Sequence, residues 1–523
     1  MDRQRRIFLL NAAQLAAFAA VGGVACARAE TTAYPFSLGV ASGSPLPDSV
    51  ILWTRILADP LNAASTAPVA LSVRWEVAED EGFRRIAAKG VASAVPALAH
   101  SVHVDVTGLA PARWYWYRFM LGDAVSPVGR TRTAPALDAM PALLKLAVAS
   151  CQHWEFGSYG AHRQIAAAAP DLVAFLGDYI YEWGPYQLKH PEKSKRSNES
   201  FTLADYRARY AQYKSDPDLQ AAHHAAPWIV TWDDHEVEND YANDRDLHLS
   251  ANFMARRAAA YQAFYEHMPI RLASPGQADY ARFRIFQRFD WGRLARFHVL
   301  DDRQYRAYHA CKDEAAGKSG SVKRRDCAAL RDPTRSMLGG EQEAWLAAGL
   351  DSSPARWNII AQQTLMAQST QTKIITPEDG RFWTDGWDGY PMARERLFGA
   401  LAKSGAANPL VLSGDVHTFY ATELRSDFYK PVSRANPVLA TEFCGTSVTS
   451  GGRPQQRTLE YVDMNPHIKY GRSDKRGFML MEVAPERTTT HFVGLDDVRD
   501  AATKTQTLAS FVVTAGLPGL ART

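Results

Sequence analysis

The chain has 523 residues, of which 46% are hydrophobic and 22% are charged, and its formal net charge is +3. This length and composition are typical of an ordinary globular protein with two to four domains. They exclude a disordered chain, a collagen-like chain and a disulfide-rich miniprotein. After residue 29, no apolar run reaches the roughly 18 residues that a membrane-spanning helix needs.

The first 29 residues have the pattern of an export signal. Three arginines at positions 3, 5 and 6 precede an interrupted apolar run over residues 7–25, and Ala-Arg-Ala at 27–29 offers a cleavage site. The order Arg5-Arg6-Ile7-Phe8-Leu9 favours a twin-arginine signal. A general secretory signal and a poor lipoprotein box at Cys26 are the alternatives. We therefore expect a periplasmic or secreted protein that uses the twin-arginine export machinery and has no stable membrane anchor.

The positive net charge belongs to this signal. Residues 1–29 contain four arginines and one aspartate, so the chain without them has no net charge. Nothing in the charge pattern indicates a nucleic-acid-binding module or an anionic membrane as a partner.

Residues 30–135 have the alternating pattern of short strands. Four such runs are separated by turn residues: Ser49–Thr54, Leu71–Val77, Ser101–Val106 and Trp114–Phe119. About 100 residues of this kind predict an N-terminal β-sandwich of the immunoglobulin or fibronectin type. The proline-containing segment 134–142 is expected to be a linker.

Residues 143–500 have a different pattern, in which short apolar strands alternate with amphipathic helices. The expected helices are Ser158–Ala169, Phe253–Met268, Gly340–Leu350 and Met392–Ser404. This alternation predicts an α/β layered domain. Residues 501–523 are expected to form a peripheral C-terminal tail.

Two cysteines, Cys311 and Cys327, flank a loop rich in lysine, glycine and serine. An oxidising compartment would permit a disulfide between them, and two unpaired thiols are the alternative. Cys444 is expected to be a packing residue.

Metal-binding side chains follow the predicted strands of the α/β domain. The candidates are Cys151 after the first strand, Asp178 and Tyr181 after the second, Asp234 and His235 after the third, and Asp415 and His417 after a later one. In α/β sheets, ligands bind at the carboxyl ends of the strands. Each motif alone has an ordinary explanation as a turn, an N-cap or a packing residue. Together they predict a metal site.

The types of side chain indicate which metals such a site would take. Thiolate, phenolate, carboxylate and imidazole together suit a charged transition metal, and the carboxylate-rich positions suit a hard cation such as Ca²⁺. Asp178 and Tyr181, three residues apart, are able to approach the same ion, and the second oxygen of Asp178 is able to bridge to a neighbouring one.

These motifs, in this order, resemble those of the PhoD-like alkaline phosphatases, a branch of the metallophosphoesterases. The stretches that carry the resemblance are Ala149-Ser150-Cys151-Gln152, Gly177-Asp178-Tyr179-Ile180-Tyr181-Glu182, Trp232-Asp233-Asp234-His235-Glu236, Asp302-Arg303-Gln304-Tyr305-Arg306, Trp387-Asp388-Gly389-Tyr390-Pro391, Ser413-Gly414-Asp415-Val416-His417 and Gly445-Thr446-Ser447. The resemblance implies an α/β fold in which a four-layer αββα metallophosphoesterase-like catalytic domain follows the N-terminal β-sandwich.

The resemblance also implies an active site with Fe³⁺ and Ca²⁺. Cys151 and Tyr181 would bind the iron, and Asp178 would be the bridging carboxylate. Asp234 stands where the wider superfamily has a ligand Asn. His417 would lie on the iron and Asp415 on calcium. The superfamily's Asp-x-His motif is replaced by Ser150-Cys151-Gln152, which argues against a di-zinc or di-manganese site.

The predicted function is hydrolysis of a small-molecule phosphate ester or phosphodiester by a metal-activated hydroxide. His235 is the candidate to orient the phosphate or protonate the leaving group. Arg303 either binds a phosphate oxygen or pairs with Asp301 or Asp302. The alternatives are a phospholipase D-type phosphodiesterase on the same fold and, more distantly, an exported surface-binding protein that captures its ligand with the β-sandwich.

Overall fold

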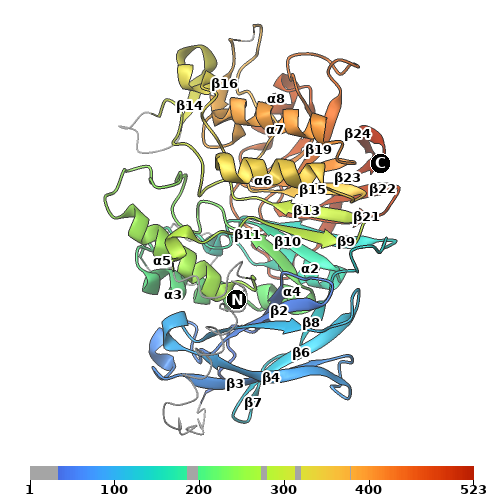
Figure 1. The fold of residues 1–523 in the computed structure, drawn as a ribbon. Coiled ribbons are helices and arrows are strands. Elements are labelled where there is room, and N and C mark those ends of the chain that lie inside the picture. Colours follow the sequence, from blue (N-terminus) through green and yellow to red (C-terminus); the bar gives the residue numbers. More distant parts are fainter. Residues whose placement is uncertain (1–32, 185–197, 272–278, 313–319, 377) are drawn as a thin grey trace, which may run out of the picture.

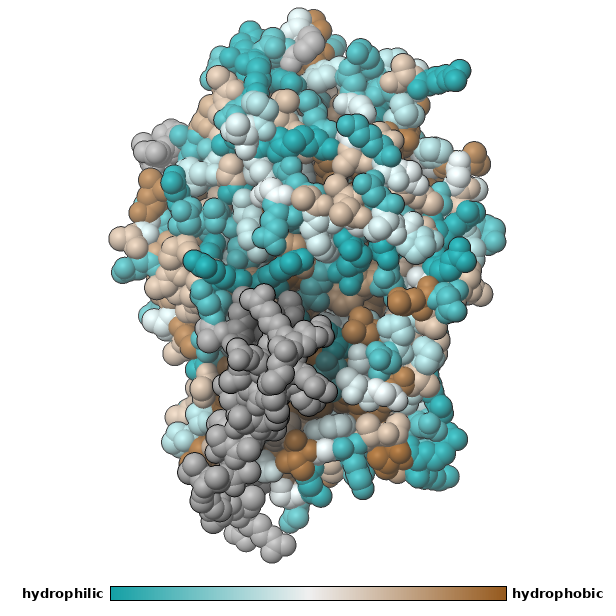
Figure 2. All heavy atoms as spheres, viewed as in Figure 1, coloured by the Kyte–Doolittle hydropathy of each residue, from teal (hydrophilic) through white to brown (hydrophobic). Residues whose placement is uncertain are grey.

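The computed structural model describes residues 33–184, 198–271, 279–312, 320–376 and 378–523 (Figure 1). The predicted twin-arginine signal, residues 1–29, lies outside the described residues. No helix within the described ranges is both long and apolar enough to cross a membrane. The face shown in Figure 2 is covered mostly by hydrophilic side chains, with hydrophobic ones in small groups.

The N-terminal domain is the predicted β-sandwich. One sheet contains the antiparallel strands β1 (Val40–Gly43), β2 (Ser49–Arg55) and β5 (Ser101–Thr107). The other contains β3 (Leu71–Ala78), β4 (Ile86–Ala94), β6 (Trp114–Leu121), β7 (Ala124–Val125) and β8 (Gly129–Arg132). Buried side chains of both sheets, among them Leu52, Val73 and Tyr117, form one core cluster between them.

The first sheet of the sandwich continues into the catalytic domain. Strand β1 pairs in parallel with β11 (Trp228–Thr231), where Gly43 lies opposite Trp228. The result is a ten-stranded sheet in the order β24-β23-β22-β21-β9-β10-β11-β1-β2-β5. Its remaining strands are β9 (Leu144–Ala149), β10 (Leu172–Leu176), β21 (Gly477–Val483), β22 (Arg487–Leu495), β23 (Thr505–Thr514) and β24 (Leu517–Arg522).

A second, seven-stranded sheet has the order β12-β13-β15-β17-β19-β18-β20. Its strands are β12 (Gln287–Trp291), β13 (Ala295–Val299), β15 (Trp357–Ala361), β17 (Pro409–Ser413), β18 (Phe419–Arg425), β19 (Val438–Cys444) and β20 (Ile468–Arg472). The neighbours β13, β15, β17 and β19 are parallel, as are β9, β10 and β11 in the first sheet. A separate two-stranded sheet pairs β14 (Ser321–Lys323) with β16 (Arg381–Trp383).

Helices cover the outer faces of the two large sheets. Buried residues of α2 (Gly160–Ala168), α3 (Leu203–Lys214), α4 (Pro217–Ala225) and α5 (Phe253–His267) share a core cluster with β10 and β11. Those of α6 (Gly339–Asp351) and α7 (Pro391–Ser404) share one with β15 and β17. Helix α8 (Gln455–Met464) packs on β20.

The space between the two sheets holds another core cluster, which includes Leu146 and Leu176 of the first sheet and Ile359 and Leu412 of the second. The order helix, sheet, sheet, helix confirms the predicted αββα architecture. Strand β10 is buried at every position, because both faces of the sheet are covered. This explains why the strands of this domain are continuous apolar runs in the sequence.

The C-terminal residues differ from the prediction of a peripheral tail. Residues 505–514 and 517–522 are the strands β23 and β24, which pair with β22 and with each other. Phe511 and Val513 of β23 are only 1% and 4% exposed, and both belong to the core between the sheets. The end of the chain is therefore part of the catalytic domain.

Candidate metal centre

The loops that follow β9, β10, β11 and β17 meet at one edge of the two sheets. They bring together all six predicted metal ligands: Cys151, Asp178, Tyr181, Asp234, Asp415 and His417. We call these six residues the base of the site. Except for Cys151, they line a cavity of about 660 Å³. The parallel direction of the strands thus places the side chains as the sequence predicted.

The possible ligand atoms of the base form overlapping groups. Within each of three groups, all ligand atoms lie within 4.8 Å of one another. The groups are Cys151–Asp178–His417, Asp178–Asp234–His235 and Asp233–Asp234–Asp415. Asp178 belongs to the first two groups and Asp234 to the last two, so these two carboxylates connect the groups.

Four residues of the base have a left-handed backbone conformation. The φ angles are 62° at Cys151, 57° at Asp178, 61° at Asp415 and 53° at His417. For a residue other than glycine this conformation costs about 1–3 kcal/mol and persists only where the surrounding structure holds it. Such strain gathers at functional sites, and here it occurs directly after strands β9, β10 and β17.

Glu236 holds two of these loops together. Its carboxylate accepts hydrogen bonds from the backbone N–H groups of Asp178 at 3.0 Å, of Asp233 at 2.7 Å and of Tyr179. Burial raises the pKa of Glu236 to about 8, although these N–H groups act in the opposite direction. The loops after β10 and β11 are therefore fixed to each other through one buried side chain.

The phenol of Tyr181 connects the residues expected around the iron. It donates a hydrogen bond of 2.8 Å to Asp178 Oδ2 and accepts one of 2.6 Å from Ser450 Oγ. His417 Nε2 lies 3.4 Å from the same oxygen, and His417 Nδ1 lies 2.7 Å from the carbonyl oxygen of Gly451. When Nδ1–H donates to this carbonyl, Nε2 is the nitrogen left to bind a metal.

The electrostatics of the base suit a bound cation. Burial is the largest cause that raises the pKa of Cys151, Asp178, Tyr181 and Asp415, and neighbouring acidic groups raise each of these pKa values further. Asp178 Oδ1 and Asp234 Oδ1 are buried and accept no hydrogen bond from any residue that the structure describes. Buried acidic groups this close together become anionic only when a positive charge compensates them. The donors therefore fit a metal ion.

Arg476 adds a buried positive charge next to these groups. Its guanidinium donates to Ser447 Oγ at 2.9 Å and to the carbonyl oxygen of Ser450 at 2.7 Å, and it forms no ion pair with a carboxylate among the described residues. Burial lowers the pKa of Arg476 to about 10, while the nearby Cys151 acts in the opposite direction. The guanidinium favours the anionic form of Cys151 and positions the Ser450 segment that contacts Tyr181.

His235 lies in the cavity with its ring against Tyr181, at 4.1 Å between ring centroids. Its Nδ1 is 2.8 Å from Glu182 Oε2, and Glu182 Oε1 accepts from the backbone N–H of Asn239. Burial disfavours the charged ring, but Glu182 and Asp234 outweigh it and raise the pKa of His235 well above its usual range. This arrangement suits the predicted proton donor.

Arg303 differs from both of its predicted roles. Its side chain is fully buried and does not line the cavity. It forms an ion pair with Asp233 and another with Asp385, in which Arg303 Nη1 lies 2.8 Å from Asp385 Oδ2. Its Nη2 lies 3.4 Å from Asp234 Oδ1. Asp385 also pairs with Arg306 and His309. The side chain of Arg303 therefore positions carboxylates next to the cavity. Asp301, one of its predicted partners, accepts a hydrogen bond from the backbone N–H of Arg303 and not from its side chain.

Several residues of the site are not among those predicted from the sequence. Asp240, Asp385, Ser450 and Arg476 all contact the base or its partners. Ser450 follows strand β19, just as the predicted ligands follow their strands, so its position in the sequence indicates that it lies at the site. Asp385 lies 82 residues from Arg303 in an irregular segment, where no pattern in the sequence indicates its place.

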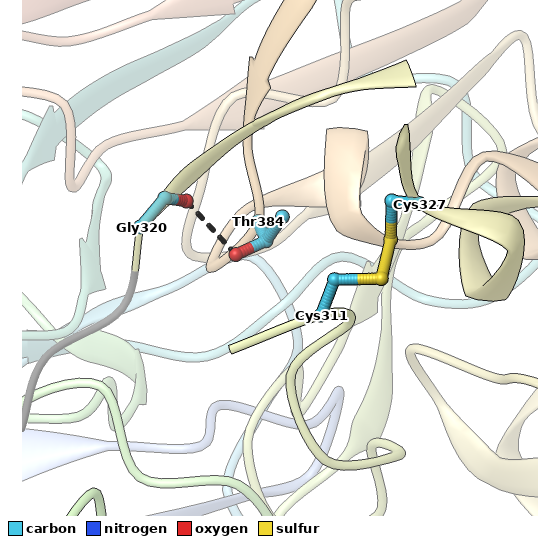
Figure 3. Close-up of a disulfide and its surroundings, with 4 residues drawn as sticks. All are labelled: Cys311, Gly320, Cys327 and Thr384. Atoms are coloured by element: carbon cyan, nitrogen blue, oxygen red, sulfur yellow. Dashed lines mark hydrogen bonds between the residues drawn. A yellow bond between two sulfur atoms is a disulfide. The ribbon is translucent and has the colours of Figure 1, made fainter. Parts of the chain in front are cut away.

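Four further residues that line the cavity are Trp383, Trp387, Arg453 and Tyr461, which we call the outer wall. The segment with the two tryptophans is attached to a loop that the predicted disulfide closes. Cys311 and Cys327 are bonded, with their Cα atoms 5.9 Å apart (Figure 3). Within this loop the carbonyl oxygen of Gly320 accepts a hydrogen bond of 2.9 Å from Thr384 Oγ1, and β14 pairs with β16 (Figure 3).

Comparison with known proteins agrees with this architecture. The family model for the PhoD-like phosphatase matches residues 146–492, and that for the PhoD-like phosphatase N-terminal domain matches residues 23–135. Alkaline phosphatase D of Bacillus subtilis (strain 168) is 44% identical over 499 residues, which cover 94% of this chain and 82% of that protein. A solved structure described as that of PhoD superposes with a TM-score of 0.87 at 43% identity, covering 94% of this chain and 92% of the other. The chain therefore belongs to the PhoD-like phosphatases, a family of phosphoric ester hydrolases.

Proposed function

We propose that the chain is an exported, metal-dependent phosphatase or phosphodiesterase that binds Fe³⁺ and Ca²⁺ at the base. The observation that carries the proposal is the gathering of a thiol, a phenol, three carboxylates and an imidazole, all buried or half-buried, around shared positions. Cys151, Tyr181 and His417 would hold the iron, because thiolate and phenolate suit Fe³⁺. Asp234 and Asp415 would hold calcium, and Asp178 would bridge. The twin-arginine pattern supports a periplasmic or secreted location.

When bound, the metals would supply positive charge to the phosphoryl oxygens and lower the pKa of a water molecule. The other tasks belong to the chain. The ring of His235 packs against Tyr181 and Trp183, and its hydrogen bond with Glu182 orients it in the cavity. As water forms its bond to phosphorus and the ester P–O bond breaks, His235 gives a proton to the departing alcohol oxygen. Thr364 donates a hydrogen bond to Asp415 Oδ2 and keeps this carboxylate in place.

The metal assignment is tested by the colour of the purified enzyme. We expect it to contain iron and to show a visible tyrosinate–iron absorption band, which Tyr181→Phe removes. Tyr179→Phe is the matched control, because Tyr179 is equally buried but its hydroxyl bonds to His223 outside the cavity lining. A colourless, iron-free enzyme with full activity would refute the assignment.

The calcium assignment is tested by chelation. We expect EGTA to abolish phosphate release and Ca²⁺ to restore it, since Asp234 and Asp415 offer oxygen ligands only. Full activity in a chelated, calcium-free sample would contradict a mixed site.

The substrate preference is tested by comparing p-nitrophenyl phosphate, its bis-ester and a phospholipid. We expect one of the first two to be the better substrate. A higher kcat/KM for the phospholipid would favour the phospholipase D-type alternative, and no hydrolysis of any of the three by the metal-loaded protein would refute the proposed function.

A further inference from the structure

Arg453 is distinctive among the side chains of the cavity. Among the described residues that line the cavity, Arg453 is the only one with a lysine or arginine side chain, whereas the base is rich in acidic groups. It lies in the segment between β19 and α8. Its guanidinium carbon lies 4.7 Å from the centre of the Tyr461 ring, which packs against one face of the planar group.

The guanidinium of Arg453 has no acidic partner. Within the part of the chain that the structure describes, it makes no ion pair and no side-chain hydrogen bond. Arg457 lies 4.8 Å from the same ring, but it is bonded to Glu460 at 2.6 Å, and it does not line the cavity. The N–H donors of Arg453 are therefore free for a ligand, and the geometry of a guanidinium suits phosphate and carboxylate.

The backbone next to Arg453 is fixed to the base. The carbonyl oxygen of Gly451 is 2.7 Å from His417 Nδ1. A Cβ atom at Gly452 would meet the Arg476 guanidinium at 2.5 Å and the carbonyl oxygen of His417 at 2.9 Å, so this glycine allows a close approach. The base thus sets the position of the Arg453 backbone, and the stacked Tyr461 ring holds its side chain at the outer wall.

These observations separate two anion-binding places in one cavity. The metal ligands form one, and the group undergoing transfer would lie there. Arg453 comes from the outer wall and is one of its four residues. We propose that Arg453 binds a second anionic group, carried by the alcohol part of the substrate. The enzyme would then prefer phosphate esters whose alcohol bears another phosphate or a carboxylate, an inference that rests on the proposed phosphatase function.

The test compares two substrates that differ only in the second anion, butyl phosphate and butane-1,4-diol bisphosphate, with the metal-loaded full chain. We expect the wild type to have a higher kcat/KM for the bisphosphate. Arg453→Gln should lower the ratio of the two kcat/KM values by about 10- to 100-fold, because a hydrogen bond between charged groups is lost. Arg453→Lys should keep part of the ratio, since it keeps the charge without the bidentate geometry.

Arg457→Gln is the matched control and should leave the ratio at its wild-type value. An equal loss for both substrates in Arg453→Gln would overturn the inference, because Arg453 would then bind the transferred group. A wild-type ratio near one, or an unchanged ratio in Arg453→Gln with a native circular dichroism spectrum, would overturn it too. Absence of phosphate release from both substrates would instead show that the proposed function has failed.

Discussion

The base and the outer wall of the cavity are built in different ways. Each residue of the base directly follows a buried strand or lies a few residues beyond one. Its surroundings are fixed by hydrogen bonds that Glu236 accepts and by those that Ser450 and Thr364 donate. The outer wall comes from the end of β16, the short turn that follows it, the segment just before α8, and the second half of α8. It is attached through the pairing of β14 with β16 and through a disulfide-closed loop.

This difference separates the chemistry of the site from its selectivity. The strands before the residues of the base cannot shift without disturbing the core clusters packed on both faces of each sheet, so the fold itself fixes the positions of the ligands. Trp383 and Arg453 of the outer wall are half-buried and lie outside these cores, so they can change without disturbing them. Trp387 is the exception, because it is only 1% exposed and belongs to the core beside α6 and α7. We therefore expect changes at the base to remove metal and activity, and changes at the outer wall to alter which ester is used.

The largest effect should come from Asp178→Asn at the base. Loss of the shared carboxylate should lower activity by more than about 100-fold and remove bound metal, because loss of a ligand's hydrogen-bond partner alone typically costs 10- to 100-fold. Elemental analysis and phosphate release measure the two effects. Trp383→Ala at the outer wall should keep the metal and change chiefly KM. Loss of metal in Trp383→Ala would abolish the distinction between the two regions.

Arg303→Met should have the next largest effect, on stability. It leaves Asp233 and Asp385 buried without their main counter-charge, and breaking a buried pair in this way costs about 3–5 kcal/mol. Urea unfolding measures the loss. The control is Arg245→Met, whose exposed pair with Asp244 should contribute less than about 1 kcal/mol. A fully stable Arg303→Met enzyme with a raised KM would return Arg303 to its predicted role as a phosphate ligand.

The smallest effect should follow from opening the disulfide at the outer wall. In the Cys311→Ser, Cys327→Ser double variant, we expect KM to rise by about threefold for bulky esters, because one weak interaction of about 0.6 kcal/mol is lost. The iron content should stay at the wild-type level. Steady-state kinetics with and without reductant check this, since reductant should affect the wild type only. A loss of iron in the double variant would show that the outer wall supports the base.

Much of this arrangement was predictable from the sequence, for a physical reason. Strands buried on both faces are unbroken apolar runs, so β10 (Leu172–Leu176) lies where the second strand of the domain is predicted, just before Asp178. The residues after each run were then expected at one edge of the sheet. Arg303 was misjudged because its partner Asp385 lies far along the chain, and only the folded structure brings the two together.

The C-terminal strands were missed for a different reason. The strand Thr505–Thr514 begins with three polar residues. Only its second half shows the alternation of buried and more exposed residues that indicates a strand. Considered alone, such a segment has the pattern of an exposed tail. It forms a strand because it pairs with β22, and the sequence does not indicate that β22 has a free edge to pair with.

The distance in sequence between the two halves of the metal site sets an order of events during synthesis. Strands β9 and β10 precede Cys151 and Asp178, but Ser450, which contacts Tyr181, lies 269 residues further along the chain. Strand β21, which pairs with β9, comes later still. A nascent chain can therefore pair β9 with β10 early, but it cannot close the metal site until the segment from Ser450 to β21 has been made. Metal insertion would consequently follow the synthesis of that segment.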